Sequence, residues 1–294
     1  MKCNIDVQFY AAPPDLQGCF SSFYRAKFTV ADGKRVKDLL QPEWANLRFF
    51  AGDCPDASVP GGKVLRNARM TTTGPSSLPV HFELGTTRMW GVGLLPLGWA
   101  KFCRVPAKQF SDQVFDGEKE PAFEGFHCLA EELFTQNDGE QAELDKIIAC
   151  FRENDREVPD QDRIVRVHAA LVDENIGSVA EFAEHAGLGR RTLERLCDRH
   201  FGFSPKMLLR RQRFMRSLAQ FMLDHAANWS EAMDGHYHDQ AQFVREFRAF
   251  MHMSPREYAA LDHPILAAFM KHRARVWGAA AQTLDPPARP ATTG

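Results

Sequence analysis

The chain has 294 residues, of which 44% are hydrophobic and 25% are charged, and its formal net charge at pH 7 is −2. These proportions are typical of a soluble globular protein, and the length allows two domains with a hydrophobic core each. A net charge so close to zero excludes a general electrostatic attraction to nucleic acid, so any basic surface must be local.

Targeting and redox signals are weak. The N-terminus lacks the apolar run of a signal peptide, and no stretch approaches the ~18 apolar residues of a membrane span. The seven cysteines are scattered without a Cys-x-x-Cys pair, which argues against a disulfide framework and against a zinc cluster. We therefore expect a cytoplasmic protein with no membrane contact, no metal and no cofactor.

The first half of the chain predicts strands followed by helices. Aromatic and β-branched runs alternate with Gly, Pro and Asp clusters, and these runs are residues 20–30, 46–51 and 89–95. Helical apolar spacing then covers residues 106–115, 125–135 and 140–153. The polar residues 153–162 are the expected linker to the second half.

A capped helix and a glycine turn open the most informative region. Ser178 and Glu181 have the spacing of a capping box, in which each side chain bonds the backbone N–H of the other residue. This predicts a helix over residues 179–185. Gly187 follows where a helix stops with positive φ, and the next amphipathic run predicts a helix over residues 190–200. Together they predict a helix-turn-helix.

The second of these helices has one apolar side, which includes Leu193 and Leu196, and one charged side. A helix that reads the DNA major groove needs this division, because Arg bonds guanine bidentately, Glu accepts from cytosine and outlying cations hold phosphates. A solvated surface helix would look similar, but the preceding cap and turn favour a recognition helix. The charged side comprises Arg190, Arg191, Glu194, Arg195, Asp198 and Arg199.

A long helix is expected next. Ser204 caps it, Pro205 occupies its first turn, and neither Pro nor Gly recurs before residue 224. A helix over residues 205–223 is roughly 28 Å long, which suits the ~34 Å between successive major grooves once the flanking units are added. Nine cationic and two acidic residues lie within residues 190–216, which predicts a local basic surface.

A second copy of the unit lies 50 residues further on, since residues 193–206 and 243–256 share their pattern of apolar residues, Arg and Ser-Pro. Residues 229–233 are expected to form its first helix, and Asp239 is expected to cap its second. Gln suits adenine, so the outward residues of that second helix are expected to read bases. A metal site at His236, His238 and Asp239 is the alternative, but no further ligand cluster completes it.

Residues 163–261 resemble the DNA-binding domain of the AraC/XylS family of bacterial transcription regulators. The resemblance rests on the runs that begin Gly187-Leu-Gly-Arg-Arg, Phe201-Gly-Phe-Ser-Pro and Tyr237-His-Asp-Gln, and on Met253-Ser-Pro. It implies seven helices, with two helix-turn-helix units joined by a long helix. The sequence departs from the family pattern at Gly189, where a capping Ser is usual, and at His236, where Gly is usual.

The resemblance also implies partners and contacts. The partner is double-stranded DNA, and RNA polymerase, a small-molecule effector and a second copy of the chain in a homodimer are further expected partners. The expected base contacts are Arg191, Glu194 and Arg195 in the first unit and Gln240, Gln242 and Arg245 in the second. The expected phosphate contacts are Arg190, Arg199, Lys206, Arg248 and Arg256. The operator, the effector and the choice between activation and repression stay open.

For the whole chain we predict an α+β protein of two domains. Residues 1–155 are the expected regulatory, effector-binding or dimerisation domain, mixed and strand-rich, which in this family is often a cupin-like barrel. Residues 162–262 are the DNA-binding domain, and residues 263–294 are a helix over 265–277 and a disordered tail.

Several residues of the strand-rich half invite a functional interpretation. Gly91 and Gly93 are expected to shape a strand and a turn rather than a dinucleotide site, because Pro96 interrupts the helix that should follow. Polar and aromatic side chains could line an effector pocket, although the aromatic ones more often belong to a core. These side chains are Trp44, Arg48, His81, Arg88 and Trp90.

Two other functions compete with DNA-dependent regulation. An enzyme with a helix-turn-helix appendage is one, but the sequence contains no P-loop, no Gly-x-Ser-x-Gly and no His-Glu-x-x-His. A protein-interaction module that has lost DNA binding is the other, because the second unit departs from the family pattern. We expect a regulator and no enzyme activity.

Overall fold

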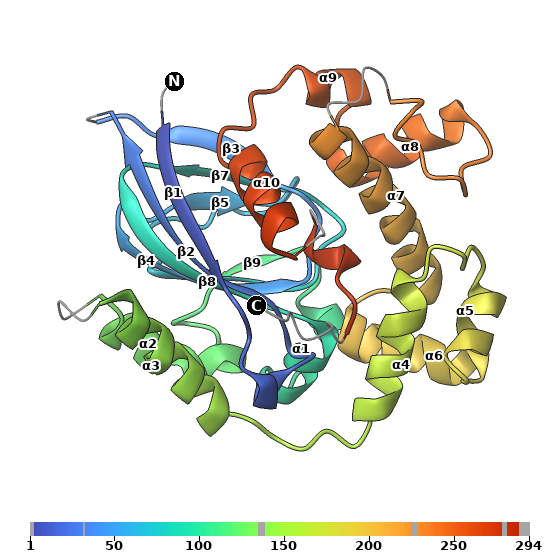
Figure 1. Ribbon diagram of the computed structural model, residues 1–294, viewed down its shortest axis with the longest axis horizontal. Helices are drawn as coiled ribbons and strands as arrows, with labels where there is room; N and C mark the ends of the chain where they lie inside the picture. The colour runs from blue at the N-terminus through green and yellow to red at the C-terminus, as the bar shows by residue number, and fades with distance from the viewer. Residues whose placement is uncertain (1–2, 32, 135–138, 225–228, 278–280, 288–294) are drawn as a thin grey trace.

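A strand-rich half and a helical half make up the molecule, which confirms the predicted α+β class (Figure 1). The structure is a computed structural model, and it describes residues 3–31, 33–134, 139–224, 229–277 and 281–287. Among these residues, no helix is both long enough and apolar enough to cross a membrane.

Two antiparallel sheets form the strand-rich half. The larger sheet has the order β1 (Cys3–Tyr10), β2 (Phe20–Val30), β8 (Thr87–Leu94), β4 (Ala45–Gly52), β6 (Met70–Thr73) and β9 (Val114–Asp116). The smaller sheet has the order β3 (Val36–Leu40), β7 (Val80–Leu84) and β5 (Asp56–Ser58). All three strands expected from the sequence are present at β2, β4 and β8.

The central strand β8 explains the paired glycines. Both Gly91 and Gly93 lie within the strand, so the strand interpretation is confirmed and no turn falls there. A Cβ at Gly91 would lie 2.1 Å from a ring carbon of Tyr24, so only glycine lets that ring lie across the strand. We expected Pro96 to interrupt a helix, and this is wrong. Pro96 instead opens helix α1 (Pro96–Phe102), where its missing N–H costs nothing.

The predicted helix over residues 106–115 is wrong. Only a short 3-10 turn, η2 (Ala107–Gln109), forms there, and β9 then pairs with β6. Asp112 has φ 57°, which ends helical geometry. Phe110 and Phe115, on either side of Asp112, pack ring to ring with centroids 5.0 Å apart.

The other helices of the first half follow the prediction more closely. Part of the segment 125–135 is helical, as η3 (Pro121–Phe126) and α2 (His127–Glu132), and α3 (Glu140–Glu153) has the predicted bounds. A short turn, η1 (Pro14–Leu16), was not expected from the sequence. Both α2 and α3 lie beside the larger sheet in Figure 1.

Nine elements build the rest of the described chain. They are α4 (Gln161–Val172), α5 (Val179–His185), α6 (Arg190–Leu196), a π turn η4 (Cys197–Phe201), α7 (Pro205–Asp224), α8 (Gln240–Met251), α9 (Pro255–Ala259), α10 (Leu266–Trp277) and η5 (Gln282–Leu284). The long helix α7 runs between the pair α5–α6 at one end and the pair α8–α9 at the other (Figure 1). The predicted helices over 179–185, 190–200, 205–223 and 265–277 are confirmed within a few residues.

The first helix of the second unit is missing from the described residues. Residues 229–239 form turns and bends, and residues 225–228 lie outside the described chain. The Trp229 ring stacks on Phe221 with centroids 3.5 Å apart, and the Asp234 carboxylate holds Arg216. These contacts to α7 hold the segment in place, and residues 229–239 do not form the further helix that the family resemblance implies.

The C-terminal tail is ordered up to residue 287, contrary to the prediction for residues 284–287. We call residues 281–287 the strap. Thr283 is 0% exposed and Asp285 is 1% exposed, and Asp285 pairs with Arg273 of α10. The rest of the predicted disordered tail, residues 288–294, lies outside the described chain. The strap is buried because it fills the junction between the two halves.

Candidate functional site

The first unit, residues 179–201, has the predicted helix-turn-helix geometry. Ser178 Oγ accepts from the Glu181 N–H at 3.2 Å, and the Glu181 carboxylate accepts from the Ser178 N–H at 2.9 Å, which completes the capping box. Gly187 has φ 64°, as the turn requires. Gly189 caps α6 without a side-chain bond, as its departure from the family pattern led us to expect.

The charged side of α6 faces solvent. Leu193 and Leu196 are buried, whereas the predicted DNA contacts of this unit are exposed. These contacts are Arg190, Arg191, Glu194, Arg195 and Arg199. Asp198 differs from them, because its carboxylate pairs with Lys108 of the strand-rich half at 2.7 Å. Asp198 therefore belongs to the junction between the halves rather than to the outward side.

The second unit, residues 229–251, presents a helix with the expected division. The Asp239 carboxylate accepts from the Gln242 N–H at 2.6 Å, so the predicted cap is present. Phe243 and Phe247 are buried. Gln240, Arg245, Arg248 and Arg256 are exposed, and Gln242 is half-buried with its Oε1 accepting from the His238 N–H at 3.0 Å.

The basic surface is smaller than the residue count predicts. Lys206 is exposed, but three of the other cations on α7 have carboxylate partners. Arg210 and Arg213 share Glu246 of α8 at 2.8 and 2.7 Å, and Arg216 pairs with Asp234 at 2.5 Å. These ion pairs join α7 to the second unit, so the prediction of a continuous basic surface is corrected to an outer set of cations.

Arg211 is the fourth exception and is 0% exposed. Its guanidinium carbon lies 3.9 Å from the centre of the Trp44 ring, and one nitrogen donates to the Ser76 backbone oxygen at 3.0 Å. Burial lowers the pKa of Arg211 to about 9. This residue holds α7 against the strand-rich half and cannot contact DNA in this arrangement.

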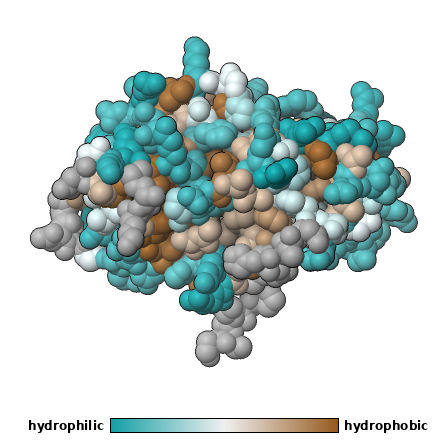
Figure 2. Space-filling view, turned by 90° about the horizontal axis from the view of Figure 1, so that it is seen from above, coloured by the Kyte–Doolittle hydropathy of each residue, from teal (hydrophilic) through white to brown (hydrophobic). Residues whose placement is uncertain are grey.

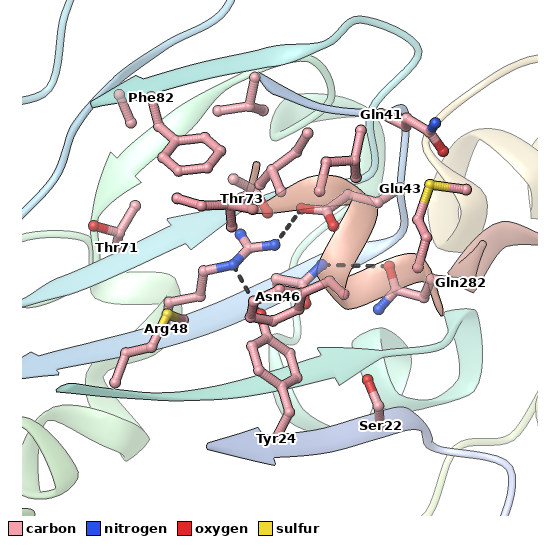
Figure 3. Close-up of a pocket in the computed structure, with 18 of the residues that line it drawn as sticks. Ser22, Tyr24, Gln41, Glu43, Asn46, Arg48, Thr71, Thr73, Phe82 and Gln282 are labelled. Atoms are coloured by element: carbon pink, nitrogen blue, oxygen red, sulfur yellow. Dashed lines mark hydrogen bonds and ion pairs between the residues drawn. The ribbon is translucent and has the colours of Figure 1, made fainter. Parts of the chain in front are cut away.

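A cavity of about 140 Å³ lies in the strand-rich half, against α7, α10 and the strap. Both sheets contribute to it, for example through Phe50 and Phe82. Met215 comes from α7, Phe269 from α10 and Gln282 from the strap. Figure 3 shows the polar lining residues gathered around Arg48 and Asn46. The cavity therefore touches the helix that joins the two candidate reading units.

A buried ion pair sits in the cavity wall. Arg48 donates to the Glu43 carboxylate at 2.6 Å and to the Tyr24 hydroxyl at 3.0 Å (Figure 3). Burial is the largest influence on the Glu43 carboxyl and raises its pKa, although Arg48 opposes this. Asn46 donates to Gln282 Oε1 at 3.3 Å. The polar groups on this wall thus largely satisfy one another.

Only one of the five suggested pocket residues lines the cavity, and it is Arg48. Trp44 packs under Arg211, and the Trp90 Nε1–H donates to Glu143 of α3 at 2.7 Å, so both belong to cores. Arg88 also pairs with Glu143, at 3.0 Å, and His81 is exposed. Met215 and Gln282 could not be identified from the sequence, because their role depends on contacts across more than 150 residues of chain.

On the face shown in Figure 2, apolar residues gather in separate patches near the middle and over the strand-rich half, with hydrophilic residues around them.

In the described part of the chain, no group of three His, Cys, Asp or Glu side chains could hold a metal ion. Asp239 of the alternative metal site caps α8 instead, and His236 Nε2 lies 2.7 Å from the Glu174 backbone oxygen.

Residues 182–260 match a family described as a helix-turn-helix domain, and the match covers both α6 and α8. No curated protein matches the chain. Among solved structures, ToxT from Vibrio cholerae is 10% identical with a TM-score of 0.43, over 88% of this chain and 98% of that chain. Wild-type ToxT bound to an unsaturated fatty acid is 11% identical with a TM-score of 0.43, over 77% and 95%. The AraC-like transcriptional activator CuxR is 12% identical with a TM-score of 0.25, over 74% and 87%.

Proposed function

We propose that the chain is a DNA-binding transcription regulator of the AraC type and that a small molecule in the cavity controls how it holds DNA. The match of residues 182–260 to a helix-turn-helix domain supports the first part of the proposal. The observation that carries this proposal is the position of Met215, which lies on the helix between the two units and also lines the cavity. A ligand that displaces Met215 would shift α7, and with it the relative position of the units.

We further propose that the two outward helix faces read adjacent major grooves. In the first unit, Arg191, Glu194 and Arg195 would contact bases, with Arg190 and Arg199 on phosphates. Their exposure and the burial of the opposite face support this assignment. In the second unit, Gln240, Gln242 and Arg245 would contact bases, and Gln242 would have to exchange its bond to the His238 N–H for one to a base. Further phosphate contacts would come from Lys206 at the start of α7, Arg248 of α8 and Arg256 of α9.

For the domains, we propose that residues 1–155 sense the effector and residues 162–262 bind DNA. Residues 263–294 would serve the first domain rather than the second. The support is that α10 packs on β1 and β3 and supplies Leu266, Phe269 and Arg273 to the lining of the cavity. The C-terminal segment would thus complete the effector site.

Charge reversal of one base-contacting residue tests the DNA-binding role. Genome-wide footprinting with the purified chain would first define its sites. Arg195→Glu is then expected to abolish protection of those sites, because a buried guanine contact becomes a repulsion worth several kcal/mol. The chain should stay folded, since Arg195 is exposed.

The matched control is Arg66→Glu, the same charge change at an exposed residue of the strand-rich half. It should leave protection unchanged. Wild-type footprints with Arg195→Glu, or an equal loss with Arg66→Glu, would contradict the assigned reading surface.

A further inference from the structure

We propose that the cavity takes an uncharged, largely apolar molecule about the size of one aromatic ring. This inference rests on the proposed role of the cavity as an effector site and adds the chemical class of the effector. Three properties of the cavity carry it, namely its volume, its aromatic wall and its internal charge balance.

The volume of the cavity limits the size of the ligand. A dry, apolar protein cavity of about 150 Å³ holds one benzene molecule, and this cavity has about 140 Å³. A single ring with a short substituent therefore fits without rearrangement.

The aromatic side chains of the cavity wall determine which ligand shape is favoured. Tyr24 of β2 lies 5.6 Å from the Phe9 ring of β1 and 5.4 Å from the Phe269 ring of α10, centroid to centroid. Phe9 and Phe269 meet edge to face at 6.1 Å. Rings in such offset and edge-on arrangements present both faces and edges, which favours a flat, polarisable guest.

The pairing of the charged residues around the cavity determines which ligand charge is favoured. Three charged residues line the cavity, and each has a partner of opposite charge in the described chain: Arg48 pairs with Glu43, and Arg273 pairs with Asp285. The Arg48 and Glu43 side chains are only 9% and 15% exposed. A buried charge without a partner is costly. An anionic guest would meet Glu43 and a cationic guest would meet Arg48, so a neutral guest is favoured.

One polar group on the guest has a partner. The Tyr24 hydroxyl accepts from Arg48 at 3.0 Å, and a hydroxyl that accepts still has its own proton to donate. The amides of Asn46 and Gln282 are engaged with each other at 3.3 Å. A carbonyl or ether oxygen on the ring would therefore bind at Tyr24.

Three probes of nearly equal shape and different charge test the inference: acetophenone is neutral, benzoate is an anion and benzamidine is a cation. By calorimetry at pH 7.5, the full chain is expected to bind acetophenone at least ~10-fold more tightly than either charged probe. Glu43→Gln leaves Arg48 without a partner of opposite charge, so this variant should prefer benzoate. Glu43→Gln combined with Arg48→Gln should restore the preference for acetophenone.

A wild-type chain that prefers benzoate or benzamidine, or binds none of the three, would overturn the inference, and so would a folded Glu43→Gln variant that still prefers acetophenone. If Glu43→Gln does not fold, as judged by its thermal melt, the double variant and the wild-type ranking decide. DNA affinity is measured separately with saturating acetophenone. Binding of acetophenone without any change in DNA affinity would refute the proposed control of DNA binding and leave the ligand class intact.

Discussion

At the residue scale, the most consequential side chains are polar ones buried where the halves meet. His168 of α4 is 1% exposed, with its ring 5.9 Å from that of Trp44, and its burial lowers its pKa to about 3. His200 at the end of the first unit is also buried, and its pKa is lowered to about 4 for the same main reason. Both imidazoles are therefore neutral in the folded chain at neutral pH.

These two histidines predict a loss of stability in acid. The unfolded chain takes up a proton on each near pH 6.5, whereas the folded chain does so only near pH 3 and 4. Stability is therefore fully present above pH 6.5 and falls as the pH drops below it. Between pH 7.5 and 5, each histidine should cost about 2 kcal/mol of unfolding free energy.

Urea unfolding at both pH values measures this loss. His168→Gln should remove about half of the difference that the two histidines cause, while His238→Gln, at an exposed position, should remove none. Equal pH dependence in wild type and His168→Gln would show that the folded chain protonates this ring without penalty.

The sequence alone could not predict which charged side chains are buried. Arg210, Arg211 and Arg213 lie within four residues on one helix, and their residue type does not show which of them is buried. The fold places Arg211 on Trp44 and turns its two neighbours toward Glu246. Helical periodicity identifies faces, but the partner of each face is set by packing between distant segments.

At the scale of elements, local signals predicted well and long-range ones did not. The capping box at Ser178 and the Ser-Pro start at Pro205 are written in neighbouring residues, and both helices begin there. The strand β9 and the strap depend on pairing with residues far away in the chain, and both were missed. The base-contacting residues remain predictions, whereas the cavity wall needed the structure.

The strap predicts a thermodynamic coupling with strand β8. Gln282 accepts from the Trp44 N–H at 2.9 Å and donates to Ser21 Oγ at 2.5 Å. A Cβ at Gly93 would lie 2.1 Å from Gln282 Nε2 and 2.2 Å from Ser21 Oγ, so Gly93→Ala should push the Gln282 side chain out and turn the Ser21 hydroxyl away. Gly93→Ala and Gln282→Ala should each cost about 2 kcal/mol of stability, because the Trp44 N–H loses its partner.

The double variant distinguishes this coupling from two independent losses. Gly93→Ala with Gln282→Ala should cost little more than either change alone, since both remove the same contacts. Gly139→Ala is the control, because a Cβ there meets nothing within 4 Å. Additive costs in chemical unfolding would show that Gln282 does not depend on the space at Gly93.

For the whole molecule, the strand-rich half holds the helical half at several separate places. Lys108 pairs with Asp198 of the first unit, Gln41 Nε2 donates to the Tyr258 hydroxyl of α9 at 3.0 Å, and Asp38 accepts from the Ile265 N–H at 2.8 Å. Both ends of α7 are therefore tied to the half that contains the cavity. A ligand there would act on the spacing of the units rather than on one unit alone.

This arrangement also divides the cations of the whole molecule into two classes, and salt dependence can tell them apart. Each phosphate that a free cation neutralises adds about 0.9 to the slope of log affinity against log salt concentration. Lys206 is exposed and proposed as a phosphate contact, so Lys206→Ala should lower the slope by about 1 at every DNA sequence. Arg213 already pairs with Glu246 at 2.7 Å, so Arg213→Ala should leave the slope unchanged.

Fluorescence anisotropy across a salt series measures both slopes. A drop with Arg213→Ala as large as that with Lys206→Ala would mean that the ion pairs along α7 open when DNA binds, and the restricted basic surface inferred from them would be wrong.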